Sequence, residues 1–201
     1  LFTADAAHEL RTPLAGIRLH LELMAQSGSS QATTLIARID QLMHTVEQLL
    51  MLARASQALA SGHYDTVNWR DNIFAPLALE NEPKDHALIW PQTGSLSVQG
   101  DATLLRLMLR NLLENAVRYS PAGTTIEVRM QEVDDGTLVS VCDQGPGIDE
   151  AHRQSITEPF RRIDQRYGGS GLGLSIVQRI VQLHRGKLTL EKDRKSTRLN
   201  S

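Results

Sequence analysis

One histidine and its neighbours carry the side chains in this sequence that are best suited to nucleophilic chemistry. His8 stands in "AHELRTPL" (7–14) beside Glu9, and Thr12 follows about one helical turn later. A neutral imidazole has one nucleophilic ring nitrogen, and a carboxylate that accepts the other N–H fixes the tautomer and raises the basicity. A solvated helix surface presents similar residues, so this segment alone leaves both interpretations open.

The apolar pattern around His8 predicts where its side chain points. Apolar residues recur at steps of three and four, which is typical of a helix with one buried stripe. They are Phe2, Ala6, Leu10, Leu14, Ile17, Leu21 and Met24. At about 100° per residue this stripe lies on the far side of the helix from His8, whereas Thr12 shares the face of His8. The sequence therefore predicts a histidine that faces solvent and not the core.

A second candidate site lies in "NLLENAVRYSP" (111–121). Asn111, Asn115 and Arg118 fall on one stripe of a predicted helix, about 140° from its apolar stripe. Amide oxygens can ligate Mg²⁺ while phosphates supply other ligands, and an arginine can approach a phosphate. The alternative is that these residues form an ordinary polar outer face. Asparagine forms helices poorly, so two asparagines in the middle of a helix argue against this alternative.

Two glycine-containing segments could complete a ligand site. "DQGPGI" (143–148) follows a predicted strand, and Asp143 is an acceptor suited to an exocyclic amine. Its glycines allow a sharp turn or the close approach of a flat ligand. "GGSGLGLSI" (168–176) runs into a predicted helix, whose N-terminal N–H groups can bind phosphate. Taken singly, the first is more often a turn and the second is as consistent with a flexible loop.

The first 59 residues are expected to form two antiparallel helices joined at "SGSSQ" (27–31). The second helix has its own apolar stripe, formed by Leu35, Ile39, Leu42, Val46, Leu49 and Ala53. A hairpin cannot cover both stripes by itself, so we predict a homodimer in which two hairpins form a four-helix bundle. The alternative is that the stripes pack on the remainder of the same chain.

The remainder of the chain predicts an α+β sandwich. Helices are expected over 101–120 and 174–184, and strands over 125–130, 138–142 and 187–191, with a hairpin across "DDG" (134–136). We place a linker at 61–66, between domains at 1–60 and 67–201. The tail 192–201 is polar and basic, and is expected to form no strand.

Composition excludes several classes of protein. The 201 residues carry a formal net charge of −2, which gives no electrostatic reason to expect nucleic-acid binding. The hydrophobic fraction of 41% supports a packed core, and one cysteine fits a reducing compartment. No apolar run is long enough to span a membrane.

The order and spacing of these segments resemble the catalytic core of two-component sensor histidine kinases. "HELRTPL" (8–14) is similar to the family's H-box, 111–121 to its N-box, and 143–148 and 169–173 to its glycine boxes, with Phe160 in "EPFRR" (158–162) between them. The resemblance covers about residues 1–190. Within the family, "RYGGSGLGLSIV" (166–177) is similar to the PmrB/BasS sensors of enterobacteria.

The resemblance implies an all-α hairpin that forms a dimeric four-helix bundle, followed by an α+β sandwich of the histidine-kinase/Hsp90-like ATPase type. It implies that ATP phosphorylates His8, oriented by Glu9, and that the phosphoryl group passes to an aspartate of a response regulator. An OmpR-like regulator of the PmrA/BasR type is the expected partner. Thr12 would orient a water that dephosphorylates the regulator.

The resemblance also implies the residues that bind ATP and Mg²⁺. They are Asn111, Asn115, Arg118, Tyr119, Asp143, Gly145, Gly147, Phe160, Gly169, Gly171, Leu172 and Gly173. Mg²⁺ would be held by Asn115, with Asn111 a second candidate, and 149–170 would form a mobile lid. Related ATPases carry a water-activating Glu where Asn111 stands, and an amide cannot act as a general base.

Two alternatives stay open: an ATPase of the wider superfamily without phosphotransfer, and a catalytically inactive dimeric scaffold. The family also ends in one more apolar strand, which the polar tail does not match, so a truncated or foreign end is expected. Upstream membrane segments are expected to hold the full-length protein in the bacterial inner membrane, with this portion in the cytoplasm.

Overall fold

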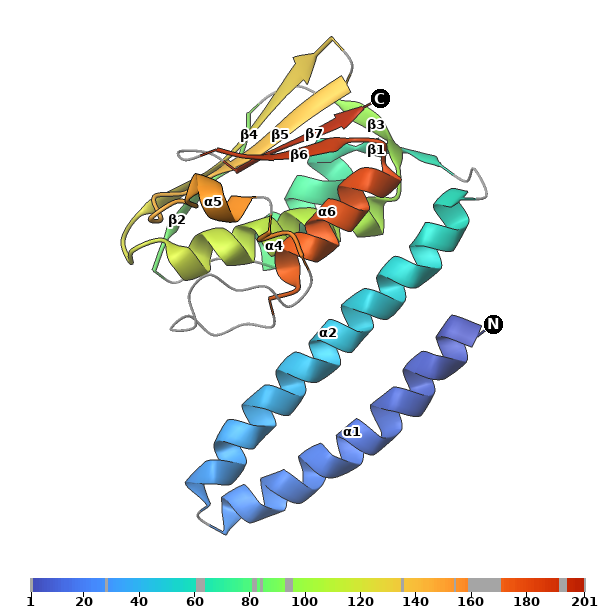
Figure 1. Ribbon diagram of the computed structural model, residues 1–201, viewed down its shortest axis with the longest axis vertical. Coiled ribbons are helices and arrows are strands. Elements are labelled where there is room, and N and C mark those ends of the chain that lie inside the picture. Colours follow the sequence, from blue (N-terminus) through green and yellow to red (C-terminus); the bar gives the residue numbers. More distant parts are fainter. Residues whose placement is uncertain are drawn as a thin grey trace. The chain divides into compact units, whose positions relative to one another are not determined.

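The computed structural model describes residues 2–27, 29–60, 64–80, 83, 85–92, 96–134, 136–153, 155–158, 171–191 and 195–200. Side chains are described in all of these except 2–11, 54–60 and 195–200. The chain divides into two compact units, Leu1–Arg54 and Ala55–Ser201. Figure 1 shows a helical hairpin and a sheet covered by helices.

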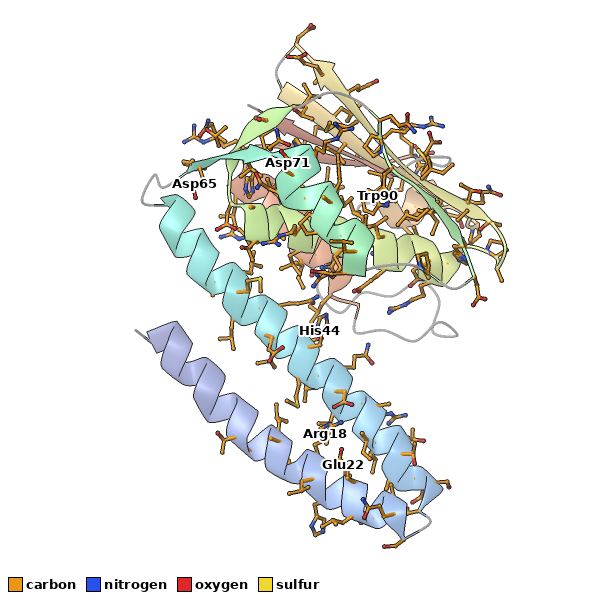
Figure 2. The ribbon with its side chains drawn as sticks, turned by 180° about the vertical axis from the view of Figure 1, so that it is seen from behind. Arg18, Glu22, His44, Asp65, Asp71 and Trp90 are labelled. Atoms are coloured by element: carbon orange, nitrogen blue, oxygen red, sulfur yellow. The ribbon has the colours of Figure 1, made fainter. Side chains whose placement is uncertain are left out.

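The first unit is the predicted hairpin. Helix α1 spans Phe2–Gln26 with Pro13 inside it, and α2 spans Ser30–Ala60, continuing past the unit boundary. Arg18 on α1 connects the two helices, because its Nε donates to Asp40 Oδ1 on α2 at 2.6 Å. The same guanidinium forms an ion pair with Glu22, one turn along α1, at 2.8 Å (Figure 2).

The apolar seam predicted for each helix divides into two sets. Leu14, Leu21 and Ile39 are partly covered within the hairpin. A second set stays exposed at heptad spacing, with Ile17 and Met24 on α1 and Leu35, Leu42 and Leu49 on α2. The exposed fractions of Ile17 and Leu42 are both 50%. Each helix of the hairpin therefore has an apolar stripe that the described residues leave exposed.

The second unit is built on a five-stranded sheet with the order β2-β4-β5-β7-β6. Its strands are β2 (Ala87–Ile89), β4 (Thr125–Val133), β5 (Gly136–Cys142), β6 (Lys187–Leu190) and β7 (Lys195–Asn200). Strand β2 pairs parallel with β4, and all other neighbours in the sheet pair antiparallel. The expected hairpin at 134–136 is confirmed, since Val133 pairs with Gly136.

Two long helices lie on one face of this sheet, as Figure 1 shows. Helix α4 spans Ala102–Tyr119 and α6 spans Gly173–Leu183. The apolar stripe predicted for α4 is confirmed as buried, and α6 also buries one set of apolar side chains. The largest fully buried side chains on the two helices are Leu104, Leu105, Met108, Leu109, Leu112, Ile176 and Ile180.

The smaller elements flank this sandwich. Strands β1 (Asp65–Asn68) and β3 (Ser97–Gly100) form a separate antiparallel pair. A π-helix at Trp69–Phe74 leads into α3 (Ala75–Glu80), and α5 spans Glu150–Arg153. The buried ring of Trp69 stacks on Phe74, which in turn contacts Trp90 (labelled in Figure 2).

The tail departs from our expectation. Residues 195–200 form β7, so the prediction of a strandless tail was wrong. Strand β7 pairs with both β5 and β6, and backbone N–H and C=O groups supply this ladder whatever the side chains are. The expected linker at 61–66 also overlaps β1, which begins at Asp65. In the parts of the chain that the structure describes, no helix is both long and apolar enough to cross a membrane.

Candidate functional site

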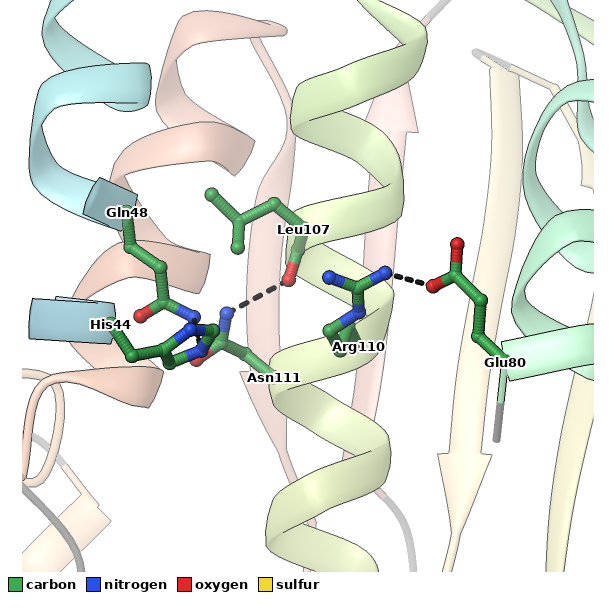
Figure 3. Close-up of polar contacts among 6 residues, drawn as sticks. All are labelled: His44, Gln48, Glu80, Leu107, Arg110 and Asn111. Carbon is green, nitrogen blue, oxygen red and sulfur yellow. Dashed lines mark hydrogen bonds and ion pairs between the residues drawn. The ribbon is translucent and has the colours of Figure 1, made fainter. Parts of the chain in front are cut away.

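The two asparagines of the predicted amide stripe lie on α4, which begins with a well-formed cap. Asp101 accepts hydrogen bonds from the backbone N–H groups of Thr103 and Leu104 at 2.8 and 2.9 Å. Three turns on, Asn111 is only 4% exposed, and its Nδ2 donates to the Leu107 carbonyl at 2.8 Å (Figure 3). This bond fixes the amide and leaves Oδ1 as an acceptor, so Asn111 does not belong to an ordinary solvated face.

Asn111 and Asn115 meet the first residue of α6. A Cβ placed on Gly173 would lie 3.1 Å from Asn111 Oδ1 and 3.5 Å from Asn115 Nδ2. The side-chain nitrogen of Asn115 is buried, and it has no hydrogen-bond partner among the described residues. Leu172, the N-cap residue of α6, supplies no side-chain hydrogen bond to that helix end. Two amides therefore meet a helix N-terminus so closely that a Cβ there would press on the Asn111 oxygen.

One turn further along α4, its C-terminal end meets the segment after β5. The backbone N–H of Gly145 donates to Asp143 Oδ1 at 2.9 Å, which holds the carboxylate against its own loop. A Cβ on Gly145 would lie 2.9 Å from that oxygen and 3.0 Å from the carbonyl oxygen of Tyr119. Glycine is thus needed at position 145 because Tyr119 and Asp143 enclose it.

Two further glycines of the predicted site have a backbone conformation that favours glycine. Gly147 and Gly171 have φ of 75° and 73°, a left-handed backbone that glycine adopts without strain. Leu172 is 3% exposed, so its side chain belongs to the core and only its backbone could face a ligand.

Gly169 and Phe160 lie outside the described residues, as does most of the expected lid. Arg118 is exposed on α4.

This donor set fits a nucleotide with a divalent cation. The partnerless nitrogen of Asn115 can donate to a phosphate oxygen, and the acceptor oxygen of Asn111 suits Mg²⁺. The N-terminus of α6 adds backbone N–H groups and the positive end of a helix dipole. At the end of α4, Asp143 accepts from the Gly145 N–H beside the Tyr119 carbonyl, and a carboxylate is an acceptor suited to the amine of a base.

The predicted phosphoryl acceptor lies on α1. His8 and Glu9 are helical, but their side chains lie outside the described part. Thr12 is exposed, as are Ala15, Leu19 and Leu23, which share the helix face of position 8. The exposed fractions of Leu19 and Leu23 are 59% and 56%. The exposure of these neighbours agrees with the wheel, and the orientation of His8 itself stays a prediction.

A groove of about 520 Å³ lies between α1 and α2 on this same face. Its apolar lining comes from Ala15, Leu19 and Met43. Its charged lining comes from Arg18, Glu22, Asp40 and Glu47. His44 completes it, and Gln48 lies one turn along α2 with the two side-chain nitrogens 2.9 Å apart (Figures 2 and 3). This groove was not predicted, because it forms only where two helices meet.

Two further contacts were missed by reasoning from the sequence. Arg110 on α4 forms an ion pair with Glu80 at the end of α3 (Figure 3). His184, just after α6, is buried against Gly100 and Asp101. The nearest signal was "LHRG" at 183–186, a histidine at a helix end.

Two protein families match the chain. Residues 1–58 match the family described as His Kinase A (phospho-acceptor) domain. Residues 100–200 match the histidine kinase-, DNA gyrase B-, and HSP90-like ATPase family. The first match includes His8, and the second includes α4, the loop after β5 and α6.

Curated relatives and a solved structure agree with these matches. Sensor protein BasS of Escherichia coli (strain K12) is 52% identical over 95% of this chain and 54% of its own length. Sensor protein kinase PmrB of Pseudomonas aeruginosa is 36% identical over 94% of this chain and 42% of its own length. This chain therefore spans about half the length of these relatives. Full-length ShkA, solved in complex with AMPPNP, is 25% identical with a TM-score of 0.68, over 99% of this chain and 46% of that one.

The ATPase-family match alone covers half of the chain, and the phospho-acceptor match covers the hairpin before it. The resemblance noted in the sequence motifs is thereby confirmed, as are the hairpin and the α+β sandwich that it implied. The chain belongs to the sensor histidine kinases of two-component systems and carries their phospho-acceptor and ATP-binding domains.

Proposed function

We propose that this chain catalyses ATP-dependent phosphorylation of His8 and passes the phosphoryl group to an aspartate of a response regulator. The observation that carries the proposal is the meeting of Asn111, Asn115 and Gly173 around a helix N-terminus. The domains proposed are 1–60 for dimerisation and phosphotransfer and 67–201 for nucleotide binding.

Each group of the nucleotide site has a part in binding ATP. Asp143 accepts from the adenine amine, and Gly145 and Gly147 shape the wall against which the base lies. Tyr119 and Arg118 flank the nucleotide. From the family resemblance, Phe160 would anchor the lid and Gly169 would belong to the glycine loop. Gly171, Gly173 and the backbone of Leu172 meet the triphosphate at the start of α6.

Mg²⁺ would be held by Asn115, with Asn111 as a second ligand. When bound, it offsets the negative charge that develops on the phosphate oxygens during transfer. The Asn111 amide, fixed by its bond to Leu107, cannot act as a base toward water. This favours retention of the γ-phosphate for His8 over its loss by hydrolysis.

On α1, Glu9 accepts the N–H of one ring nitrogen of His8, and the other nitrogen attacks the γ-phosphorus in line with the departing oxygen of ADP. Thr12 orients a water that attacks the phosphorylated regulator in the reverse activity. Thr12→Ala is therefore expected to keep autophosphorylation and lose regulator dephosphorylation. Equal loss of both activities would refute this role.

The exposed leucines support a dimer. Leu35, Leu42 and Leu49 repeat every seven residues on α2, and Ile17 and Met24 repeat likewise on α1. Such a stripe buries itself efficiently against a second copy, which completes a four-helix bundle. We propose that the dimer forms through this stripe, which leaves the opposite face of the hairpin free.

The groove on that opposite face is the proposed regulator contact. It lies on the face predicted for His8 and combines an apolar lining with four charged side chains. The partner proposed for this groove is an OmpR-like regulator of the PmrA/BasR type. Because the relatives named BasS and PmrB are about twice as long, we further propose that segments upstream place the full-length protein in the bacterial inner membrane.

Incubation with γ-labelled ATP and Mg²⁺ tests the main proposal. The wild-type chain should acquire an acid-labile label and pass it to a candidate regulator. His8→Gln should bind ATP but acquire no label. ATP turnover without labelled protein would indicate the superfamily ATPase, and the absence of nucleotide binding would indicate the inactive scaffold.

A further inference from the structure

His184 joins the end of α6 to the beginning of α4. Its ring is 4% exposed, with Nδ1 2.8 Å from the carbonyl oxygen of Ile180. The backbone N–H of Asp101 donates to Nε2 at 3.1 Å. A carbonyl can only accept and a backbone N–H can only donate, so the partners assign a neutral ring that is protonated on Nδ1.

The ring occupies space that a side chain would otherwise fill. A Cβ on Gly100 would lie 2.6 Å from His184 Cδ2 and 2.7 Å from Nε2. Gly100 ends β3 and pairs with Asp65 of β1. His184 therefore contacts the end of one strand, the N-cap residue of α4 and its own helix at once.

The contact between His184 and Asp101 and the contact between Gly173 and the two asparagines lie at opposite ends of the interface between α4 and α6. Asn111 follows Asp101 by about three helical turns, and His184 follows Gly173 by about the same distance. The helices α4 and α6 thus run antiparallel and meet at Asp101–His184 at one end and at Asn111–Gly173 at the other. A shift of α4 along α6 would break the first contact and misplace the second.

We propose that His184 is a positioning residue for the nucleotide site. By accepting the Asp101 N–H, it fixes the axial register of α4 against α6 and so the distance of Asn111 and Asn115 from the α6 N-terminus. This inference rests on the nucleotide site proposed above. His184 itself contacts neither the amide pair nor Gly173.

The arrangement requires a neutral ring. A proton on Nε2 would set two N–H donors against each other and remove the bond to Asp101. Burial lowers the pKa of His184, although the Ile180 carbonyl and the charge of Asp101 partly oppose this. Gly100 and Ile180, which contact the ring from β3 and α6, carry no charge, and Arg185 next to it is exposed. Acidification should therefore loosen the register of the two helices.

Two substitutions distinguish the effect of the hydrogen bond to Asp101 from the effect of side-chain volume. His184→Leu fills the space but leaves the Asp101 N–H without an acceptor. His184→Gln keeps an acceptor that does not titrate. Val128→Ala, at a buried position on β4, is the control for general loss of stability. All are made in the full 201-residue chain.

The first measurement is the affinity for a non-hydrolysable ATP analogue with Mg²⁺ between pH 5 and pH 8. His184→Leu should weaken binding about tenfold at pH 8. The wild type should weaken as the pH falls, and His184→Gln should bind within about twofold of wild type at pH 8 with a flatter pH profile. Equal weakening in His184→Leu and a Val128→Ala variant of matched stability would overturn the proposal.

The second measurement does not depend on nucleotide. Amide hydrogen exchange in the first turn of α4 should be faster in His184→Leu than in wild type, and close to wild type in His184→Gln. Unchanged exchange in His184→Leu would overturn the positioning role. If the wild-type chain binds no analogue, the proposed ATP site fails, whereas exchange still decides whether His184 fixes α4.

Discussion

Gly173 at the start of α6 lies so close to Asn111 on α4 that a Cβ would come within 3.1 Å of the amide oxygen. The contact involves the end of a side chain that is itself hydrogen-bonded to Leu107. A methyl group at position 173 must therefore displace the oxygen that the proposed site uses as a ligand.

Gly173→Ala should separate nucleotide binding from folding. Alanine favours the helix, so the free energy of unfolding should stay the same or rise by up to about 1 kcal/mol. The affinity for an ATP analogue, measured by calorimetry, should fall about tenfold. Gly16→Ala is the matched control, since a Cβ there meets nothing within 4 Å. Undiminished affinity in Gly173→Ala would contradict the placement of the phosphates.

Asp143→Asn should reduce the discrimination between bases. The amide oxygen can still accept from the Gly145 N–H, so the loop should keep its shape. The second carboxylate oxygen becomes an NH₂ donor, which cannot accept from an adenine amine. We expect the preference for an ATP analogue over a GTP analogue to fall about tenfold in competition binding. A preference equal to that of wild type would place the base elsewhere.

Leu42→Glu should dissociate the dimer. Leu42 is 50% exposed in the middle of the heptad-spaced stripe, and a buried carboxylate at a helix–helix interface is strongly unfavourable. Sedimentation velocity should show monomers at concentrations where the wild type is dimeric. Leu79→Glu is the control, because Leu79 is 89% exposed on α3. If both variants stay dimeric, the stripe does not form the interface.

The stability of the second unit should fall in acid because of His184. Burial lowers the pKa of His184 below its ordinary value of 6.5. Between these two values the unfolded chain holds the proton and the folded protein does not. The contribution of His184 to the free energy of unfolding is therefore fully present above about pH 6.5. It decreases as the pH falls below that value, by up to roughly 1.4 kcal/mol per pH unit.

Urea unfolding between pH 5 and pH 8 measures this dependence. His184→Gln should show a shallower slope than wild type, and the difference between the two isolates this group from other titrating residues. Val128→Ala, at a buried position on β4, is the control for a loss of stability alone. A wild-type slope in His184→Gln would assign the acid sensitivity to another group.

Removal of residues 192–201 should unfold the second unit but not the hairpin. Strand β7 pairs with β5 along six residues from Gly136 to Val141, and with β6 along four. Its loss would leave β6 without a neighbour and one edge of β5 unpaired. Circular dichroism should retain a helical signal and lose the cooperative transition of the sheet unit. A variant that shuffles the sequence 195–200 without proline is the control, and it should fold because the ladder is made by the backbone.

The elements with strong periodicity were predictable from sequence. The apolar stripe of α4 and its separate amide stripe were both identified, because a long helix shows its faces in its spacing. Strand β2 was missed, since three residues carry little pattern and its parallel partner β4 is distant in the chain. Strand β7 was rejected for its polar side chains, although two neighbours supply its hydrogen bonds.

The site divides in the same way. Asn111, Asn115, Asp143 and the glycines stood out by type and spacing, and the structure brings Asn111 and Asn115 to Gly173, and Asp143 to Gly145. His184 did not stand out, because its meaning depends on Gly100 and Asp101, more than eighty residues earlier. One apolar stripe was predicted for each helix of the hairpin. In the structure, some residues of each stripe are partly covered and the others are exposed.

Strand β7 lies between β5 and β6, so the sheet stays interrupted until residues 195–200 are in place. During synthesis on the ribosome, α1 and α2 emerge before the strands of the sheet and can form their hairpin from local contacts. The ATP-binding unit, by contrast, can close its sheet only after residues 195–200 have left the exit tunnel. If the proposed dimer forms through the hairpins, two nascent copies can associate before either can bind nucleotide.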